Sequence, residues 1–524
     1  MDIWPYSLLR QVVSLIPNNA DRIKITLLCK RLFEVREKYL SFNTQQFILQ
    51  RTKYNSTSIA SHLNSYKQII FNDVALKKNQ SALITIPMHI VPLDSFDHCF
   101  FLSMTSVQDI WQDEILSMHD RIGRIEIMSP SDYPFSSYFW IELSVLMEKL
   151  SRSGSNVQLA YNERSWNRRN MAPLPRLPFT ELTIVFDGDV ASTDHTAFNQ
   201  TIMDLPISLT VLNIKGNFVG TLDGVLPDGL KVLTMDDVWN QPITPGIIPS
   251  GLESLSLGRQ YNHHLDLECI HNLTHLSLGA EYNHVITSPP SLKKLIIRSP
   301  NPVFSQINES LKTLILKRVQ SNVIATITGS SFPSLTCLQV RSFTDKADKI
   351  HLMSLPLSIQ SLSLQFSRPF TLPTGLRELS LCTLPGFGSK KNKHWLSDSI
   401  TSLTINQCDE IQQIGDIPSS VTSLTYHSGA PINFKHLPTS LRSLTISGEL
   451  LRLHRPPSNS ITELNILDIN GRMLARLHRL TDTLFLLLND DLSHCGFTIY
   501  DSIINHTKGP ADPTSTEPSK CSVS

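Results

Sequence analysis

Apolar residues recur along more than half of the chain in one short pattern, apolar-x-x-Leu-x-apolar. Two clear copies lie at 252–257 and 273–278, and fourteen copies lie between about residues 177 and 466. The central leucine moves from Leu182 to Leu464 in 13 steps, or about 22 residues per step. Residues two apart on a strand point to the same side, so each copy predicts a short strand with one buried face. A strand of this kind cannot bury its apolar face alone, and the pattern therefore predicts stacked coils that share one core.

Two further features mark the turns between these strands. Several copies follow a phrase such as Leu-Pro-x-Gly-Leu at 226–230 or Leu-Pro-x-Ser-Leu at 437–441. Proline presets φ and glycine tolerates positive φ, so each phrase can reverse the chain before a strand. Four residues after the last anchor, some coils carry an aromatic residue that is mostly followed by asparagine: Phe218, Trp239-Asn240, Tyr261-Asn262 and Tyr282-Asn283. We expect the aromatic rings to stack and the asparagines to bond to loop backbone.

The copy at 239–258, which begins Trp239-Asn240-Gln241-Pro242-Ile243, resembles an FNIP repeat. FNIP repeats are 22-residue relatives of leucine-rich repeats, named for their aromatic-Asn-x-Pro-Ile core. The resemblance extends over about 177–466, and the coils at about 205–290 follow the pattern best. It implies a leucine-rich-repeat-like solenoid, and the spacing of about 22 residues lies in the same range.

Outward-facing strand residues would decide what such a solenoid binds. Between the last two anchors most coils carry a small uncharged polar residue, such as Ser256 or Thr404. Cations gather at or beside three neighbouring strands, and they form a candidate target-binding basic patch of Lys294, Arg298, Lys317, Arg318 and Arg341. These side chains could bind an acidic or phosphorylated partner segment. A solvated charged surface is the alternative interpretation.

The first 45 residues carry a helical pattern instead. Helical spacing predicts one apolar face from Leu8, Leu9, Val12, Val13 and Ile16, and Pro17 ends that helix. Asn18, Asn19 or Asp21 can cap a following helix, whose apolar stripe is Ile23, Leu27, Leu28, Leu32 and Val35. A helical hairpin of about 40 residues has little stability alone and would gain stability by packing on a partner.

This segment resembles an F-box in its phrases Pro5-Tyr6-Ser7-Leu8-Leu9 and Leu28-Cys29-Lys30-Arg31-Leu32. Trp4, Ser7 and Leu28 stand where F-box families commonly have Leu, Glu and Val. The resemblance implies binding to a Skp-type adaptor of a cullin ubiquitin ligase. It assigns the partner contact to Pro5, Leu8, Leu9, Val12, Leu28, Cys29 and Leu32. The same helices also fit a plain cap on the solenoid.

The remaining segments are less patterned. Short apolar runs at 46–170 indicate a mixed α/β segment, or irregular early coils, before the solenoid at 171–470. Residues 471–504 are interpreted as a C-terminal cap, and the polar, proline-containing residues 505–524 as a disordered tail. The final Cys521-Ser522-Val523-Ser524 matches a prenylation motif by chance or by function. A single lipid on Cys521, with no basic cluster beside it, would anchor the chain to membranes only weakly.

Composition narrows the function. The 524 residues include 46 Lys and Arg and 46 Asp and Glu, which argues against non-specific nucleic-acid binding. We expect no signal peptide and no membrane span, because no N-terminal leader pattern or long apolar window occurs. Eight scattered cysteines without a CxxC pair fit the cytoplasm or nucleus. The histidines at 263, 264, 271, 275 and 284 have no carboxylate or cysteine in register, so we expect no metal site and no cofactor.

No phosphate loop, HExxH or G-x-S-x-G motif occurs, and the sequence therefore predicts a protein that is not an enzyme. The predicted fold is α+β, a short helical head followed by a solenoid with one strand per coil. We interpret the chain as an adaptor whose head binds a Skp-type adaptor and cullin and whose solenoid binds an unknown protein target. The alternative is a repeat scaffold with no role in a ubiquitin ligase.

Overall fold

The structure is a computed structural model, and it describes the chain in separate segments. The described residues are 5–43, 66, 69, 85–87, 100–104, 122–128, 137–154, 157–166, 177–186, 205–267, 270–305, 309–345, 352, 354–364, 372–381, 396–406, 417–427, 437–447, 458–468, 471, 473–488 and 495–500. Cys521 and the rest of the predicted tail lie outside them.

A solenoid with one continuous parallel sheet dominates the molecule. Each of the fourteen predicted copies coincides with a strand: β5 (Phe179–Phe186), β6 (Val211–Gly216), β7 (Val232–Thr234), β8 (Ser254–Ser256), β9 (His275–Leu278), β11 (Lys294–Ile297), β13 (Thr313–Leu316), β14 (Cys337–Val340), β15 (Ser361–Leu364), β16 (Glu378–Leu381), β17 (Ser402–Ile405), β18 (Ser423–Tyr426), β19 (Ser443–Ser447) and β20 (Glu463–Leu467). The sheet register sets the central leucines of successive coils side by side, as in Leu276, Leu295 and Leu314. The predicted solenoid is confirmed.

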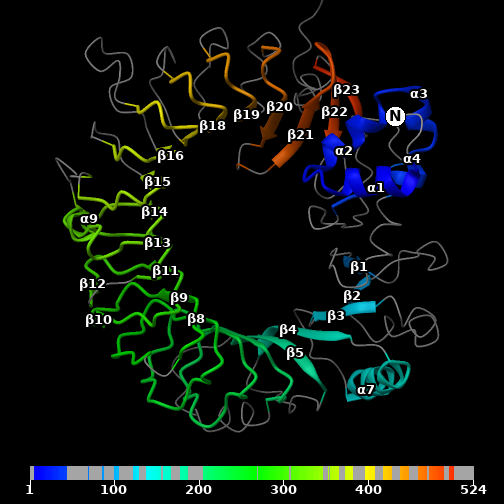
Figure 1. Cartoon of the computed structure of the whole chain (residues 1–524). Coiled ribbons are helices and arrows are strands. Elements are labelled where there is room, and N and C mark those ends of the chain that lie inside the picture. The colour runs from blue at the N-terminus through cyan, green and yellow to red at the C-terminus, as the bar shows by residue number, and fades with distance from the viewer. Residues whose placement is uncertain are drawn as a thin grey trace, which may run out of the picture.

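The sheet curves into an arc and lines its inner side (Figure 1). The outer side carries the loops, the short helix α9 (Val323–Thr326) and the two-stranded sheet of β10 (Val285–Ile286) and β12 (Val303–Phe304). The core lies between these layers. Leu295 and Ile297 are fully buried, whereas the alternate residues Lys294 and Ile296 are half-buried on the inner, concave face.

The proline phrases form the turns that the sequence predicts. The backbone N–H of Leu230 donates to the carbonyl of Pro227 at 3.0 Å, and Leu252 bonds to Pro249 in the same way. A contribution that we did not predict comes from the serine before the first anchor. The hydroxyls of Ser420 and Ser440 donate to the first-anchor carbonyl of the preceding coil at 2.7 and 2.8 Å. The Leu-Pro-x-Ser-Leu phrase therefore makes a turn and also links one coil to the next.

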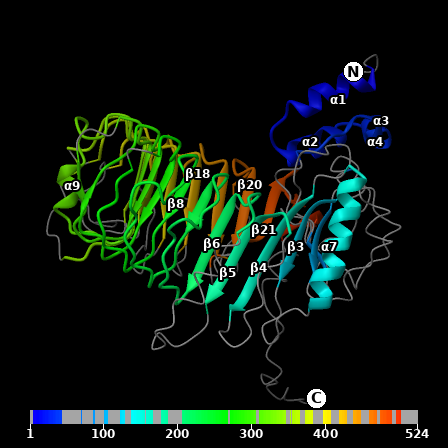
Figure 2. The same cartoon turned by 90° about the horizontal axis from the view of Figure 1, so that it is seen from below.

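The segment before the predicted solenoid extends the same sheet. Its strands β1 (Thr85–Pro87), β2 (Phe100–Met104), β3 (Ile122–Met128) and β4 (Gln158–Trp166) pair in parallel and join β5. Helix α7 (Ser137–Arg152) packs beside them (Figure 2). Its Trp140 ring lies edge-on to Tyr161 of β4 and to Phe179 of β5, with centroids 5.1 and 6.4 Å apart.

The C-terminal end changes strand direction. After β20, the strands β21 (Met473–Arg479), β22 (Leu484–Leu488) and β23 (Cys495–Ile499) pair antiparallel. Between β21 and β22 the chain reverses within residues 480–483, because antiparallel neighbours need no crossover coil. These three strands close the last coil of the solenoid.

The N-terminal head consists of α1 (Tyr6–Ser14), α2 (Asn19–Thr26), α3 (Lys30–Glu34) and α4 (Arg36–Tyr39). Asn18 caps α2 by accepting from the N–H of Ala20 at 2.8 Å. The prediction of one second helix with a continuous stripe from Ile23 to Val35 is wrong. The backbone of Cys29 is extended, with φ −157° and ψ 158°, and this separates α2 from α3.

The head lies beside the C-terminal strands (Figure 1). His478 of β21 is buried opposite Glu463 of β20, and Asp21 and Lys24 of α2 are close enough to act on it electrostatically. Burial is the main cause that lowers the pKa of His478 to about 4. Segments from the two ends of the sequence therefore meet at one end of the solenoid.

Candidate interaction surfaces

Arg22 organises the interior of the head. Its side chain is 5% exposed and donates to the carbonyls of Ile16, Ser41 and Ser14 at 2.6, 2.9 and 2.8 Å. Asn19 adds two bonds to the backbone of Asn43, one in each direction. These contacts hold the loop after α1 and the chain after α4 against α2, so the short helices form one unit.

The outer surface of that unit is apolar. Leu8 and Val12 of α1 and Leu15, which caps its C-terminal end, follow one another at helical spacing and are 41%, 38% and 82% exposed. Leu28, in the turn between α2 and α3, is 65% exposed. Leu9 and Val13 form the neighbouring, buried stripe of α1. Helix α1 is thus apolar over a wider arc than the head itself covers, which is typical of a helix that contacts a partner.

The seven residues assigned by the F-box resemblance divide into two groups. Pro5, Leu8, Val12, Leu28 and Cys29 are exposed. Leu9 and Leu32 are each 7% exposed and pack inside the head, so they support the surface rather than form it. Leu15, the C-terminal cap of α1, was not singled out by the resemblance, yet it is more exposed than Leu8 or Val12, and helical spacing from Leu8 could have identified it.

The concave face of the solenoid is mostly neutral and polar. The residue between the last two anchors is Ser256 in β8, Ser277 in β9, Thr404 in β17 and Thr425 in β18, with asparagine or glutamine in a few coils. Among the coils with described strands, β11 and β13 differ. They carry Ile296 and Ile315, which are direct partners in the sheet register.

Three cations of the predicted basic patch lie directly after the adjacent strands β11, β13 and β14. The N–H groups of Arg298, Lys317 and Arg341 donate to the carbonyls of Leu278, Ile297 and Leu316 at 3.1, 2.8 and 2.9 Å. The hydrogen-bond ladder therefore runs one residue beyond β11, β13 and β14 and sets these three cations side by side. Burial, and then the charges of Arg298 and Arg341, lower the pKa of Lys317. Lys294 lies at the other end of β11, and Arg318 follows Lys317 on the exposed edge.

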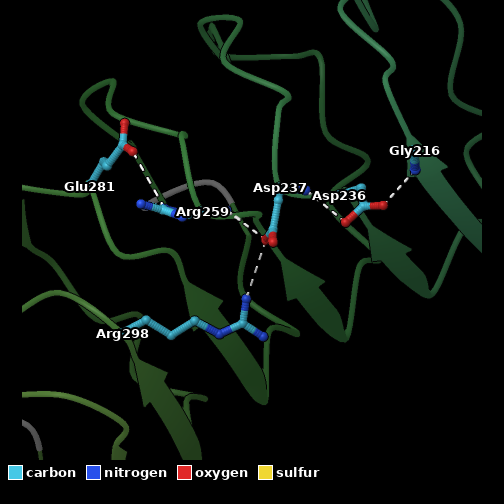
Figure 3. A network of polar contacts seen from close by, with 6 residues as sticks. All are labelled: Gly216, Asp236, Asp237, Arg259, Glu281 and Arg298. Atoms are coloured by element: carbon cyan, nitrogen blue, oxygen red, sulfur yellow. Dashed lines mark hydrogen bonds and ion pairs between the residues drawn. The ribbon is translucent and has the colours of Figure 1, made fainter. Parts of the chain in front are cut away.

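A carboxylate reaches this patch from three coils away. Asp237, which follows β7, lies 3.6 Å from the guanidinium of Arg298 and also accepts from the N–H of Arg259 at 3.0 Å (Figure 3). Gly258 and Gly279 occupy the positions equivalent to Arg298 in the two coils between them. Since glycine has no side chain, the long side chain of Arg298 can extend across these coils to Asp237. Arg259 also pairs with Glu281 at 3.7 Å.

The aromatic and asparagine residues form two ladders inside the loops, as the sequence predicts. Trp239, Tyr261 and Tyr282 are buried, and their rings stack at 5.6 and 6.3 Å with interplanar angles of 9° and 7°. The side-chain oxygen of Asn240 accepts from the N–H of Asn262 at 3.0 Å, and Asn262 accepts from the next coil in the same way. These contacts are structural, because each one joins a coil to its neighbour.

The histidines of these coils bond to the same loops. Nε2 of His263 lies 3.2 Å from the carbonyl of Asn240, and Nε2 of His284 lies 3.1 Å from that of Asn262. Over the described residues, no group of three or more His, Cys, Asp and Glu has a geometry that could hold a metal ion. No described helix is long and apolar enough to cross a membrane.

Comparison with known proteins identifies one repeat. The family model for the FNIP repeat matches residues 239–270, which contain the Trp239–Tyr261 stack and the first asparagine rung. No curated protein matches the chain.

Two solved structures are similar to the chain. One is CroV588, described as a novel circular leucine-rich-repeat protein, with 18% identity, 74% of this chain covered and a TM-score of 0.35. The other is the APL1 leucine-rich-repeat domain, with 14% identity, 80% of this chain and 96% of that domain covered, and a TM-score of 0.30. The match spans 64% of the length of CroV588. The stacked coils and the matched repeat together identify a repeat protein that contains a segment similar to FNIP repeats.

Proposed function

We propose that this chain is a protein-interaction adaptor that serves as a substrate receptor of a cullin-type ubiquitin ligase. In this proposal the helical head binds a Skp-type adaptor and the concave face of the solenoid binds the target protein. The chain contributes no chemistry of its own, and it acts by holding the target near the ligase.

The observation that carries the proposal is the exposed apolar stripe of α1 together with Leu28. Leu8, Val12, Leu15 and Leu28 are large aliphatic side chains that remain exposed to water on a unit of only about 40 residues. Burying one such side chain contributes roughly 1.5–3 kcal/mol, so a partner that covers the stripe gains affinity from each of them. The F-box resemblance gives that partner its identity, a Skp-type adaptor.

The solenoid supports the second half of the proposal by its shape. Its sheet presents one side chain from each coil at each level of the concave face, and neighbouring coils are about 4.8 Å apart. An extended surface of this kind is suited to a protein partner. The residues that depart from the neutral pattern, Ile296, Ile315 and the basic patch, lie together on adjacent strands.

A repeat scaffold without a ligase is the second candidate, and the position of α2 favours it. Asp21 and Lys24 of α2 lie close to the buried His478 of β21, so the head already covers the end of the solenoid. Capping uses α2, whereas the exposed stripe belongs to α1 and to Leu28. The two roles therefore use different residues of the head, and substitutions can test them separately.

Direct binding of a purified Skp-type adaptor to the full-length chain tests the proposal by isothermal titration calorimetry. The test variant is Leu8→Asp with Leu28→Asp, because both leucines are exposed and neither change disturbs the interior of the head. Ile207→Asp with Leu357→Asp is the matched control, since these residues are 92% and 81% exposed on the solenoid.

We expect the unmodified chain and the control to bind the adaptor equally. The head variant should bind about 100-fold more weakly or not at all, because two interface contacts of about 1.5 kcal/mol each are lost and two charges are added. A cullin should then co-purify with the chain and the control only. No adaptor binding by the folded, unmodified chain, or equal binding by the head variant, would contradict the receptor proposal and leave the scaffold.

A further inference from the structure

The concave surface of β11, β13 and β14 carries both charge and apolar exceptions to the pattern of the solenoid. We propose that this surface is the target site and that it binds an acidic, extended peptide segment in which apolar side chains alternate with carboxylates. The inference rests on the proposed function in one respect, namely that the solenoid rather than the head holds the target.

The spacing of the cations fits a ligand with several negative charges. Arg298, Lys317 and Arg341 follow the last residue of three adjacent parallel strands and are held in register by backbone hydrogen bonds. Neighbouring strands are about 4.8 Å apart, so the bases of the three side chains are closer than the screening length of physiological salt, about 8 Å. Each cation therefore feels the repulsion of the next.

The described structure neutralises only part of this charge. Arg298 has its ion pair with Asp237, whereas no described carboxylate forms an ion pair with Lys317 or Arg341. The lowered pKa of Lys317 reflects the same imbalance, because burial and the two neighbouring arginines disfavour its charged form and Asp237 opposes them. A carboxylate brought by a ligand would stabilise all three cations at once, which is the basis of charge complementarity.

The apolar part of the ligand is indicated mainly by Ile296, which is half-buried on the concave face. Its register partner Ile315 is 8% exposed and adds only a small apolar edge. The two isoleucines lie two residues before Arg298 and Lys317 on the same strands, or about 6.6 Å along each strand. The equivalent positions of β8, β9, β17 and β18 carry serine or threonine. Lys294 stands at the far end of β11, so Ile296 lies between two cations along its strand. A segment with an aliphatic side chain between acidic ones matches this order.

Asp237 then acts as an internal competitor. In the unliganded chain, Asp237 pairs with the guanidinium of Arg298. A ligand carboxylate would have to share that guanidinium with Asp237 or displace Asp237 from it. Neutralising Asp237 should therefore strengthen binding of the acidic segment. A merely solvated charged surface would show no such response.

Fluorescence anisotropy with the full-length chain tests the inference. The probe is a short fluorescein-labelled peptide of alternating glutamate and leucine, and the uncharged comparison has glutamine in place of glutamate. The test variant is Lys317→Glu with Arg341→Glu. Lys215→Glu with Arg377→Glu is the matched control, because Lys215 of β6 and Arg377, directly before β16, are exposed cations outside the patch and the net charge changes equally.

We expect the unmodified chain to prefer the glutamate peptide, with affinity that falls as salt rises from about 50 to about 300 mM. The patch variant should lose about tenfold or more in affinity and the control should lose less than about twofold. Asp237→Asn, which keeps an acceptor for the N–H of Arg259, should bind about threefold more tightly. If the charge reversal unfolds the coil, Lys317→Gln with Arg341→Gln provides a second variant with weakened binding. Its circular dichroism spectrum should match that of the unmodified chain.

Equal affinity for the two peptides, or equal loss in the control, would overturn the inference. The Leu8→Asp and Leu28→Asp variant should bind the glutamate peptide normally. Failure of the receptor proposal and failure of this inference are therefore distinguishable.

Discussion

Replacing Trp239 by alanine should unfold the FNIP-like coils locally and leave the distant coils intact. Trp239 is 1% exposed, stacks on Tyr261 at 5.6 Å, and donates from Nε1 to the carbonyl of Gly220 at 2.8 Å. Removing a buried aromatic side chain of this size typically costs about 3–5 kcal/mol, part of it from the cavity left behind. Trp239→Phe keeps most of the packing but leaves the buried carbonyl without its donor, which costs about 1–3 kcal/mol.

The location of the effect is as informative as its size. In a solenoid each coil contacts only its neighbours, so lost stability remains near the altered coil. Hydrogen–deuterium exchange of full-length Trp239→Ala should be faster in β6 to β9 and unchanged in β17 to β20. Phe332→Ala is the matched control, because Phe332 is equally buried and packs on Phe304 with centroids 5.2 Å apart. Its faster exchange should appear in β13 and β14 instead.

Uniformly faster exchange in every strand of Trp239→Ala would refute this reasoning. It would mean that the arc unfolds as one cooperative unit rather than coil by coil. A change below about 1 kcal/mol in urea unfolding would equally contradict the assigned packing of the indole.

Three further outcomes follow from particular contacts. The folded-state pKa of His478 lies near 4, below its unfolded value of about 6.5, so its contribution to stability is complete above pH 6.5 and is lost as the pH falls to 4. Urea unfolding of the unmodified chain should therefore show a loss of about 3 kcal/mol between pH 6.5 and pH 4, and His478→Gln should lack this loss. Parallel pH curves for the two proteins would contradict the burial of His478. Gly279→Ala would place Cβ onto the carbonyl of Gly258 and should lower the free energy of unfolding by about 1–3 kcal/mol, which a drop in melting temperature would report. The Cβ of Gly329→Ala would have ordinary contacts, so this control should leave the melting temperature nearly unchanged. Arg22→Met removes the donors of three backbone carbonyls and should make the head sensitive to limited proteolysis while the solenoid stays resistant. Digestion of the head at the same rate as in the unmodified chain would contradict the role of Arg22.

The two candidate surfaces differ in how far the sequence could identify them. The basic patch was predictable because coil spacing alone sets Arg298 and Lys317 at equivalent positions of neighbouring strands. Its pairing with Asp237 was not, because the contact crosses three coils and depends on two glycines that leave the path open. On the head, helical spacing identified the apolar residues of α1 but could not tell the buried Leu9 from the exposed Leu8, since both lie on one wide apolar face.

The solenoid could be derived from the sequence alone, since the strand, the buried leucines and the proline turns all lie within one repeat of about 22 residues and depend on local spacing. So could the aromatic and asparagine ladders, which require only that equivalent positions stack. The arrangement of the head at the end of the arc could be read only from the tertiary structure. Whether α2 lies close to β21, and hence which side of the head remains free, depends on residues more than 400 positions apart, such as Lys24 and His478, which act on each other electrostatically. Local periodicity carries no information about such pairs, because they form only when the curvature of the whole sheet brings the two ends of the chain together.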